Sequence, residues 1–322
     1  MASSKLPADG IVALLAATFL TGFGLKTFEA WPQVLDLWQA EVHPILLIGH
    51  PHLFRYLVAY PGFMLEAYLP SLGFSLYVGL FFAANVALWR KLSLLVCERK
   101  PTVWAWAIFL AAHLAMNGRG VIAWTAWLLC ACTCLEMNRG EIQAGRKLVA
   151  MAGASLLAAV STGVFMVTVS ALTYFHWKAS RTRPKKMSRL KRYTLYLVAT
   201  PIVFVMANYF ATALTKNLDF YGGGLTGALT MLEHGLGVFL LGRSTSILLV
   251  LTALSPLLAV AVLLMISGRP MRPAQTLLAF AIGGGLFGFT VLTLAIPIAL
   301  ICFQYRAANR SRKFIKPGSY AI

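Results

Sequence analysis

The sequence predicts an all-α protein, a polytopic transmembrane helix bundle of about ten membrane-embedded helices that forms a single integral membrane domain over residues 1–322. Three observations predict this class. Hydrophobic residues make up 59% of the chain, and the mean hydropathy is +0.75. Charged residues make up 12%, against roughly 25% in soluble domains. Long apolar runs alternate with short basic loops. A chain with so few charges cannot cover itself with a polar surface, so we expect lipid to be its solvent.

Apolar runs that approach the roughly 20 residues of a full crossing define the predicted spans. These runs are 10–28, 71–89, 102–116, 120–137, 193–215, 226–242, 246–266 and 275–303. A further apolar run, 148–176, is too long for one upright helix and too short for two full ones. It is either a single crossing or a helical hairpin with its tip near Ser161, Thr162 and Gly163.

The distribution of positive charge predicts the topology. The loop 178–192 carries eight basic residues and no acid, so the positive-inside rule places it in the cytoplasm, and the basic C-terminal tail belongs there too. The basic loops 90–101 and 138–147 face the same side only if 148–176 is a hairpin. We therefore expect the hairpin, and both termini in the cytoplasm. The net charge of +18 is then explained by topology and anionic lipid headgroups, and we expect no nucleic-acid partner.

This topology leaves three external segments. The longest, 29–70, contains aromatic residues, acids and three histidines, His43, His50 and His52, and is expected to lie on or dip into the membrane interface. The second is the turn 117–120. The third, 216–225, contains Gly222, Gly223 and Gly224, which allow another backbone or a ligand to approach closely.

Arg119 lies in the turn Met116-Asn117-Gly118-Arg119-Gly120, at the predicted external start of a helix. Free N–H groups and the positive end of the helix dipole favour an anion at such a position. An arginine adds a bidentate fork for phosphate, so the turn is a candidate anion site. The alternative is an arginine that snorkels to the interface and caps a hairpin.

Arg55 and Tyr56 precede the sequence Tyr60-Pro61-Gly62-Phe63, and Glu66 follows it. An external carboxylate at this position is a candidate general base. The alternative is that the tyrosines and the arginine only anchor the segment at the interface.

Glu233 and His234 fall inside the predicted span 226–242, where a charge must be paired or line a cavity. The alternative is that 226–242 is an amphipathic external helix and both residues are solvated.

Five cysteines are present, and Cys130, Cys132 and Cys134 share one apolar run. A C-x-C-x-C run on a helix points its thiols in different directions, so we expect packing residues and no zinc site. No metal and no cofactor are expected.

The order of features resembles the EpsG/Wzy-type polysaccharide polymerases of the bacterial inner membrane. The resemblance covers roughly residues 50–240. It rests on the Pro-Gly-Phe element at 61–63, on the arginine in MNGRGVIAWTAWLLC, and on Ser170-Ala171-Leu172 in the short hairpin. The acid that this family carries before Pro-Gly-Phe is Tyr60 here, and Glu66 is the substitute within reach. The family's arginine corresponds to Arg119.

The resemblance implies a glycosyltransferase that joins repeat units carried on undecaprenyl pyrophosphate at the periplasmic face, for O-antigen, capsule or exopolysaccharide. Arg119 would stabilise the departing pyrophosphate, with Arg55 assisting. Glu66, Asp219 and His52 are the candidate bases. The further candidates for substrate contacts are Tyr56, Tyr60, Asn117 and Tyr221. Membrane lipid and a chain-length regulator are the other expected partners.

Three other functions remain open. An O-antigen ligase would differ only in its acceptor. A transporter or flippase for the same lipid-linked sugars would need paired charges around a central cavity. A non-catalytic membrane subunit of a polysaccharide synthesis machine would need neither an acceptor site nor such a charged cavity.

Overall fold

The computed structural model describes residues 32–182 apart from 48, 49, 51 and 115, residues 273–314 apart from 286–288, and single residues and short stretches between 193 and 230. Every element in this described part is helical, in agreement with the predicted class. The predicted spans 10–28 and 246–266 lie outside it, as do Glu233 and His234.

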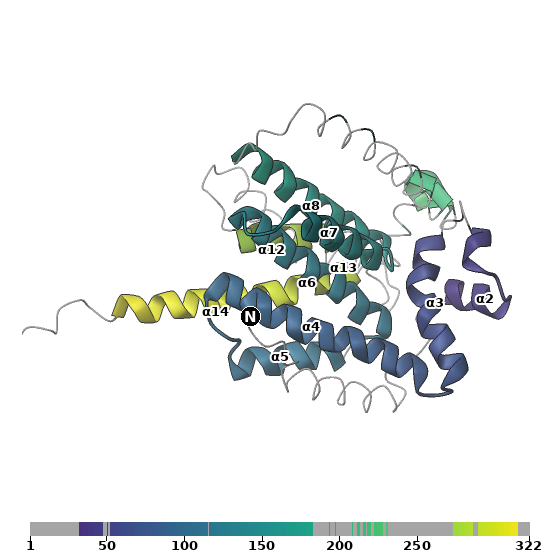
Figure 1. Cartoon of the computed structure of the whole chain (residues 1–322), viewed down its shortest axis with the longest axis horizontal. Helices are drawn as coiled ribbons and strands as arrows, with labels where there is room; N and C mark the ends of the chain where they lie inside the picture. The colour runs from purple at the N-terminus through teal and green to yellow at the C-terminus, as the bar shows by residue number, and fades with distance from the viewer. Residues whose placement is uncertain are drawn as a thin grey trace, which may run out of the picture.

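Ten α-helices and one 3-10 helix make up the described architecture (Figure 1). In chain order they are α2 (Pro32–Gln39), η3 (Pro44–Leu47), α3 (Leu53–Tyr68), α4 (Gly73–Cys97), α5 (Val103–Leu114), α6 (Gly118–Arg139), α7 (Ala144–Ala158), α8 (Thr162–Thr182), α12 (Pro273–Gly284), α13 (Phe289–Thr293) and α14 (Ala295–Phe314).

Within the described part, α4 and α6 are the two helices long and apolar enough to cross a membrane. Both begin within two residues of the predicted spans. However, α4 continues past residue 89 to Cys97, so Arg90 and Lys91 lie on a helix and not in the loop that the sequence predicted. The reason is packing: Trp89 and Leu92 are buried, and Lys91 forms an ion pair with Glu136 of α6.

The segment 148–176 is a helical hairpin, as predicted. Helix α7 ends at Ala158, residues 159–161 form the turn, and α8 starts at Thr162. Lys147 Nζ, in the first turn of α7, lies 2.5 Å from His176 Nδ1 in α8, so the two helices run antiparallel.

The prediction of one helix over 275–303 is wrong. Helix α12 ends at Gly284, and the chain then returns through α13 into α14. A Cβ on Gly284 would overlap the side chain of Val167, and Tyr174 contacts Phe280, so α12 runs antiparallel to α8. The apolar run is continuous in sequence because both arms are buried, and glycine permits the tight contact where the chain turns back.

Cross-helix pairs give the directions of the remaining helices. The side chains of Thr125, Cys132 and Arg139 of α6 donate to carbonyls of α4 exactly 44 residues earlier in each case, so α4 and α6 run parallel. Helix α5 returns antiparallel to α4, because Phe82 meets His113 while Trp89 meets Trp106. Helix α14 runs with α4, since Trp89 Nε1 donates to Pro297 O and Ser93 lies 3.4 Å from Gln304 Oε1.

One end of the bundle therefore collects the C-terminal ends of α4, α6, α8 and α14 and the N-terminal ends of α5, α7 and α12. We call it the basic end. Its basic residues include Arg90, Lys91, Arg99, Lys100, Arg139, Arg146, Lys147, Lys178 and Arg181. The opposite end, where α4 and α6 begin and where α2 and α3 lie, is called the far end (Figure 1).

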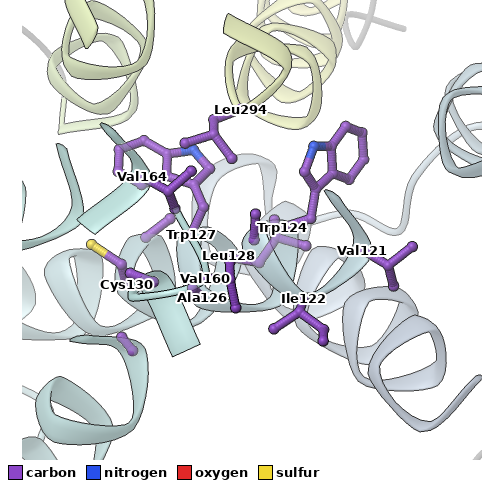
Figure 2. Packing of buried hydrophobic residues seen from close by; sticks show 14 of the residues in the cluster. Val121, Ile122, Trp124, Ala126, Trp127, Leu128, Cys130, Val160, Val164 and Leu294 are labelled. Atoms are coloured by element: carbon purple, nitrogen blue, oxygen red, sulfur yellow. The ribbon is translucent and has the colours of Figure 1, made fainter. Parts of the chain in front are cut away.

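Helix α6 lies at the centre of the bundle. Nearly all of its apolar stretch is buried by other helices. Figure 2 shows the indoles of Trp124 and Trp127 projecting toward Leu294, which lies in the turn between α13 and α14. Trp124 Nε1 donates to Thr293 Oγ1 at 3.2 Å, so a polar tip inside the apolar core finds a partner. The cysteines of α6 are buried packing residues, as expected.

Candidate functional site

Two short elements fold over helix α3 at the far end. The Trp38 ring of α2 stacks on Phe63 of α3, with ring centroids 5.4 Å apart. Tyr56 of α3 is fully buried, and its hydroxyl donates to Val42 O at 2.9 Å. These contacts hold the loop after α2 against the middle of α3.

The loop and α3 enclose a half-open cavity of about 440 Å³, which we call the aromatic cavity. This volume lies within the range of small-molecule sites. Its lining combines aromatic rings with polar groups, from Trp38, Gln39, Glu41, Val42, His43, Tyr56 and Tyr60. The ring of Tyr60 lies at its middle, edge-on to Trp38, His43 and Tyr56 at centroid distances of 5.6, 6.5 and 5.5 Å.

Two polar groups of the aromatic cavity are available to a ligand. The Glu41 carboxylate and the Tyr60 hydroxyl make no hydrogen bond or ion pair with any residue that the structure describes. Glu41 also has a φ of 53°, in the left-handed region. The Glu41 N–H donates to Trp38 O and the Val42 N–H to Leu37 O, which is the Schellman arrangement that ends a helix and that usually places glycine at this position.

A second group of side chains, which we call the basic cluster, lies at the start of α3. It consists of His50, His52, Arg55 and Lys216. Burial, and after it the positive charges of Arg55, His50 and Lys216, lowers the pKa of His52 to about 4. Burial and Lys216 also lower the pKa of His50. His52 Nδ1 is buried without a hydrogen-bond partner among the described residues. Because the lowered pKa values keep both imidazoles uncharged near neutral pH, Arg55 and Lys216 supply the positive charge that favours an anion here.

The basic cluster and the aromatic cavity are neighbours on one helix. His52 precedes α3, and Tyr56 and Tyr60 follow at intervals of four residues, so the three share one face. Four residues of helix rise by about 6 Å. An anionic group at His52 would therefore lie one helical turn from a ligand in the cavity.

Arg119 lies in the first turn of α6, as predicted, and Asn117 is the residue that caps this helix. Asn117 Oδ1 accepts the Gly120 N–H at 2.9 Å. The guanidinium of Arg119 therefore lies near the positive end of the helix dipole. Phe74 links this turn to α3, because a Cβ on Gly118 would come within 3.4 Å of its ring and one on Gly62 within 2.9 Å.

Glu66 is placed differently from the prediction. Its Oε1 accepts the Ser71 N–H at 2.7 Å and its Oε2 accepts the Phe74 N–H at 2.8 Å. Both oxygens thus cap the start of α4, which has no other side-chain cap. The sequence suggested a base because the carboxylate precedes a span, but the tight α3–α4 turn brings N–H donors to it.

Asp219 is exposed, three residues after Lys216 of the basic cluster. Gly222, Gly223 and Gly224 all have positive φ, as expected for a glycine loop that side chains would strain. Tyr221 lies outside the described residues.

Sequence reasoning missed Trp38, Glu41 and Lys216 as members of the site. Residues 38 and 41 precede α3 by more than ten positions, and Lys216 follows its last residue, Tyr68, by 148. A signal for the first two was present, since the segment 29–70 is rich in aromatic residues. No local pattern indicates that the charge of Lys216 acts on His52.

Among the described residues, no group of three or more His, Cys, Asp or Glu side chains is arranged to hold a metal ion. Comparison of the chain with protein-family models, with curated proteins and with solved structures gave no match.

Proposed function

We propose that this chain is an inner-membrane glycosyltransferase that polymerises oligosaccharide units carried on undecaprenyl pyrophosphate. The observation that supports this most directly is the basic cluster one helical turn from the aromatic cavity. A lipid-linked sugar has a pyrophosphate joined to a sugar ring, so it needs a cationic site and a saccharide site side by side. Both lie at the far end, away from the basic end.

The chemistry requires a cation where negative charge develops. In the transfer, the bond between the anomeric carbon and the pyrophosphate oxygen breaks, and the lipid pyrophosphate leaves with the electron pair. Arg55, Lys216 and Arg119 carry the positive charge for that group. The guanidinium forks of Arg55 and Arg119 suit bidentate contact with phosphate oxygens.

The orientation follows from the charge on the two ends. With the basic end in the cytoplasm, the far end faces the periplasm, where the lipid-linked units are joined. Reporter fusions at residue 185 and after residue 322 test this orientation. Cytoplasmic signals from both are expected, and periplasmic signals from both would reverse the map.

A transporter is the principal alternative, and the packing argues for the enzyme. A flippase needs a charged path through the bundle, whereas the described interior is filled by Trp89, Phe109 and Trp124. The buried Asn85 donates to His113 Nε2 at 3.0 Å and to Val121 O at 2.9 Å, which joins α4, α5 and α6. These polar groups stabilise the helix packing.

The experiment is a gel of surface polysaccharide from a strain that lacks the native gene and carries a variant. Arg119→Ala and Arg55→Ala should abolish polymer while single repeat units still reach the surface. Arg119→Lys keeps the charge but loses the planar fork, so it should also be strongly impaired.

Arg146→Ala is the matched control, because Arg146 is an exposed arginine at the basic end. It should leave the ladder unchanged, and protein levels are checked by blot. Normal ladders from Arg119→Ala and Arg55→Ala at normal protein levels would contradict the proposed anion site. Loss of every surface unit, with the lipid-linked unit retained inside, would favour a flippase.

A further inference from the structure

We infer that the aromatic cavity binds the acceptor sugar and that Glu41 accepts the proton of the attacking hydroxyl. The inference rests on the proposed function and assigns the carboxylate that the reaction needs. Glu41 is the described acid that lines the cavity, and Glu66 is the far-end acid that the sequence predicted as a candidate base.

The environments of the two carboxylates decide between them. Glu66 uses one lone pair on each oxygen to cap α4, at 2.7 and 2.8 Å from backbone nitrogens. The Glu41 carboxylate has no such bond to any described residue, and Glu41 lines the cavity. A base must meet the proton that it removes, so geometry selects Glu41.

The lining of the aromatic cavity suits a sugar ring. A hexose has apolar C–H faces and a rim of hydroxyl groups. Trp38 and Tyr60 offer ring surface to the faces, while the Glu41 carboxylate, the Gln39 amide, the Tyr60 hydroxyl and the His43 imidazole are hydrogen-bonding groups for the rim. The lining combines these two kinds of contact within one small volume.

An organic cation is the competing ligand, because a carboxylate beside aromatic rings also attracts ammonium groups. Two observations favour the sugar. One face of Trp38 is covered by Phe63, at an interplanar angle of 11°, so the rings do not form an open cage. The basic cluster lies one turn away along α3, and its positive charges repel a cation.

The transfer step balances as follows. A hydroxyl oxygen of the acceptor sugar forms a bond to the anomeric carbon of the donor. Its proton passes to the Glu41 carboxylate. The bond from the anomeric carbon to the pyrophosphate breaks, and the electron pair leaves on the lipid pyrophosphate at the basic cluster. Glu41 then returns the proton to water.

Three substitutions in the gel assay test this role. Glu41→Gln keeps the size and removes the base, so polymer should fall by about 100-fold or more, the contribution of a general base. Glu41→Asp keeps the carboxylate and should retain part of the activity, which a purely structural role would not explain. Tyr60→Phe removes a hydroxyl contact and should shorten the ladder.

Glu98→Gln is the matched control. Glu98 also follows a helix with a left-handed φ, 58°, but it lies at the basic end, so its ladder should equal that of the wild type. If deletion of the gene abolishes polymer while Glu41→Gln and Tyr60→Phe give normal ladders, the cavity is not the acceptor site. If deletion leaves polymer intact, the proposed function itself is wrong.

Discussion

Replacement of Glu66 by glutamine is expected to destabilise the protein without removing a catalytic group. The carboxylate accepts two N–H groups, from Ser71 and Phe74. Glutamine has one acceptor oxygen, and its NH2 group cannot accept, so one bond is lost. The bond to Phe74 is the more buried, so the exposed bond to Ser71 is the one that glutamine gives up.

The magnitude follows from these contacts. A hydrogen bond to a charged group contributes about 1.5–3 kcal/mol, and water replaces part of that at an exposed position. Loss of a negative charge at the start of α4 adds about 0.3–1 kcal/mol. Glu66→Gln should therefore cost about 2 kcal/mol in the free energy of unfolding, and Glu66→Ala about 3 kcal/mol because both bonds are lost.

Thermal melts of the detergent-purified protein measure the effect, with the surface ladder recorded in parallel. The melting temperature of Glu66→Gln should fall by several degrees, and its ladder should decrease only as far as its protein level does. Glu98→Gln, an exposed glutamate in the loop after α4, should change stability by less than about 0.5 kcal/mol. An unchanged melting temperature together with a lost ladder would mean that Glu66 is the base after all.

Four further predictions follow from the described contacts. Glu41→Gly should raise the free energy of unfolding by about 1 kcal/mol in a melt, because glycine adopts the left-handed φ of 53° without strain, and any loss would contradict the backbone argument. Folding lowers the pKa of His52 from 6.5 to about 4, so the unfolded chain takes up the proton first as the pH drops. The free energy of unfolding should therefore decline from about pH 6.5 toward pH 4, and His52→Gln should weaken that decline. A cysteine at Thr162, the first residue of α8 after the hairpin turn, should react with an impermeant thiol reagent from outside. Labelling only after the inner membrane is opened would reverse the orientation. Asn85→Leu should cost about 1–2 kcal/mol, since it strands the buried His113 Nε2, whereas a cost near zero would mean that water replaces the bond.

Local sequence patterns were sufficient for much of the helical framework. Apolar runs predicted the starts of α4 and α6 to within two residues. Helix α4 begins at Gly73, and α6 begins at Gly118, directly after the Asn117 cap. The hairpin 148–176 followed from the charge distribution, and the antiparallel helices α7 and α8 confirm it. Arg119 was placed correctly at a helix start for the same local reasons.

The site itself was only partly predictable. Tyr56, Tyr60, His52 and Arg55 were chosen from one short stretch, and the structure groups them on α3. The choice of Glu66 as the base depended on its position in the sequence, and that position does not show which N–H groups a carboxylate will meet. Glu41 was not chosen, because its role depends on a cavity formed between two helices.

The sequence by itself determined the helical class, the hairpin and the gathering of basic charge, because these depend on periodic or summed properties of consecutive residues. The tertiary structure alone decided that 275–303 folds back on itself, that Glu66 caps α4, and that the charge of Lys216 acts on His50 and His52. Each of these depends on a contact between residues distant in the chain or on the path of a turn. Composition constrains which segments are buried, but packing decides which buried or exposed groups meet.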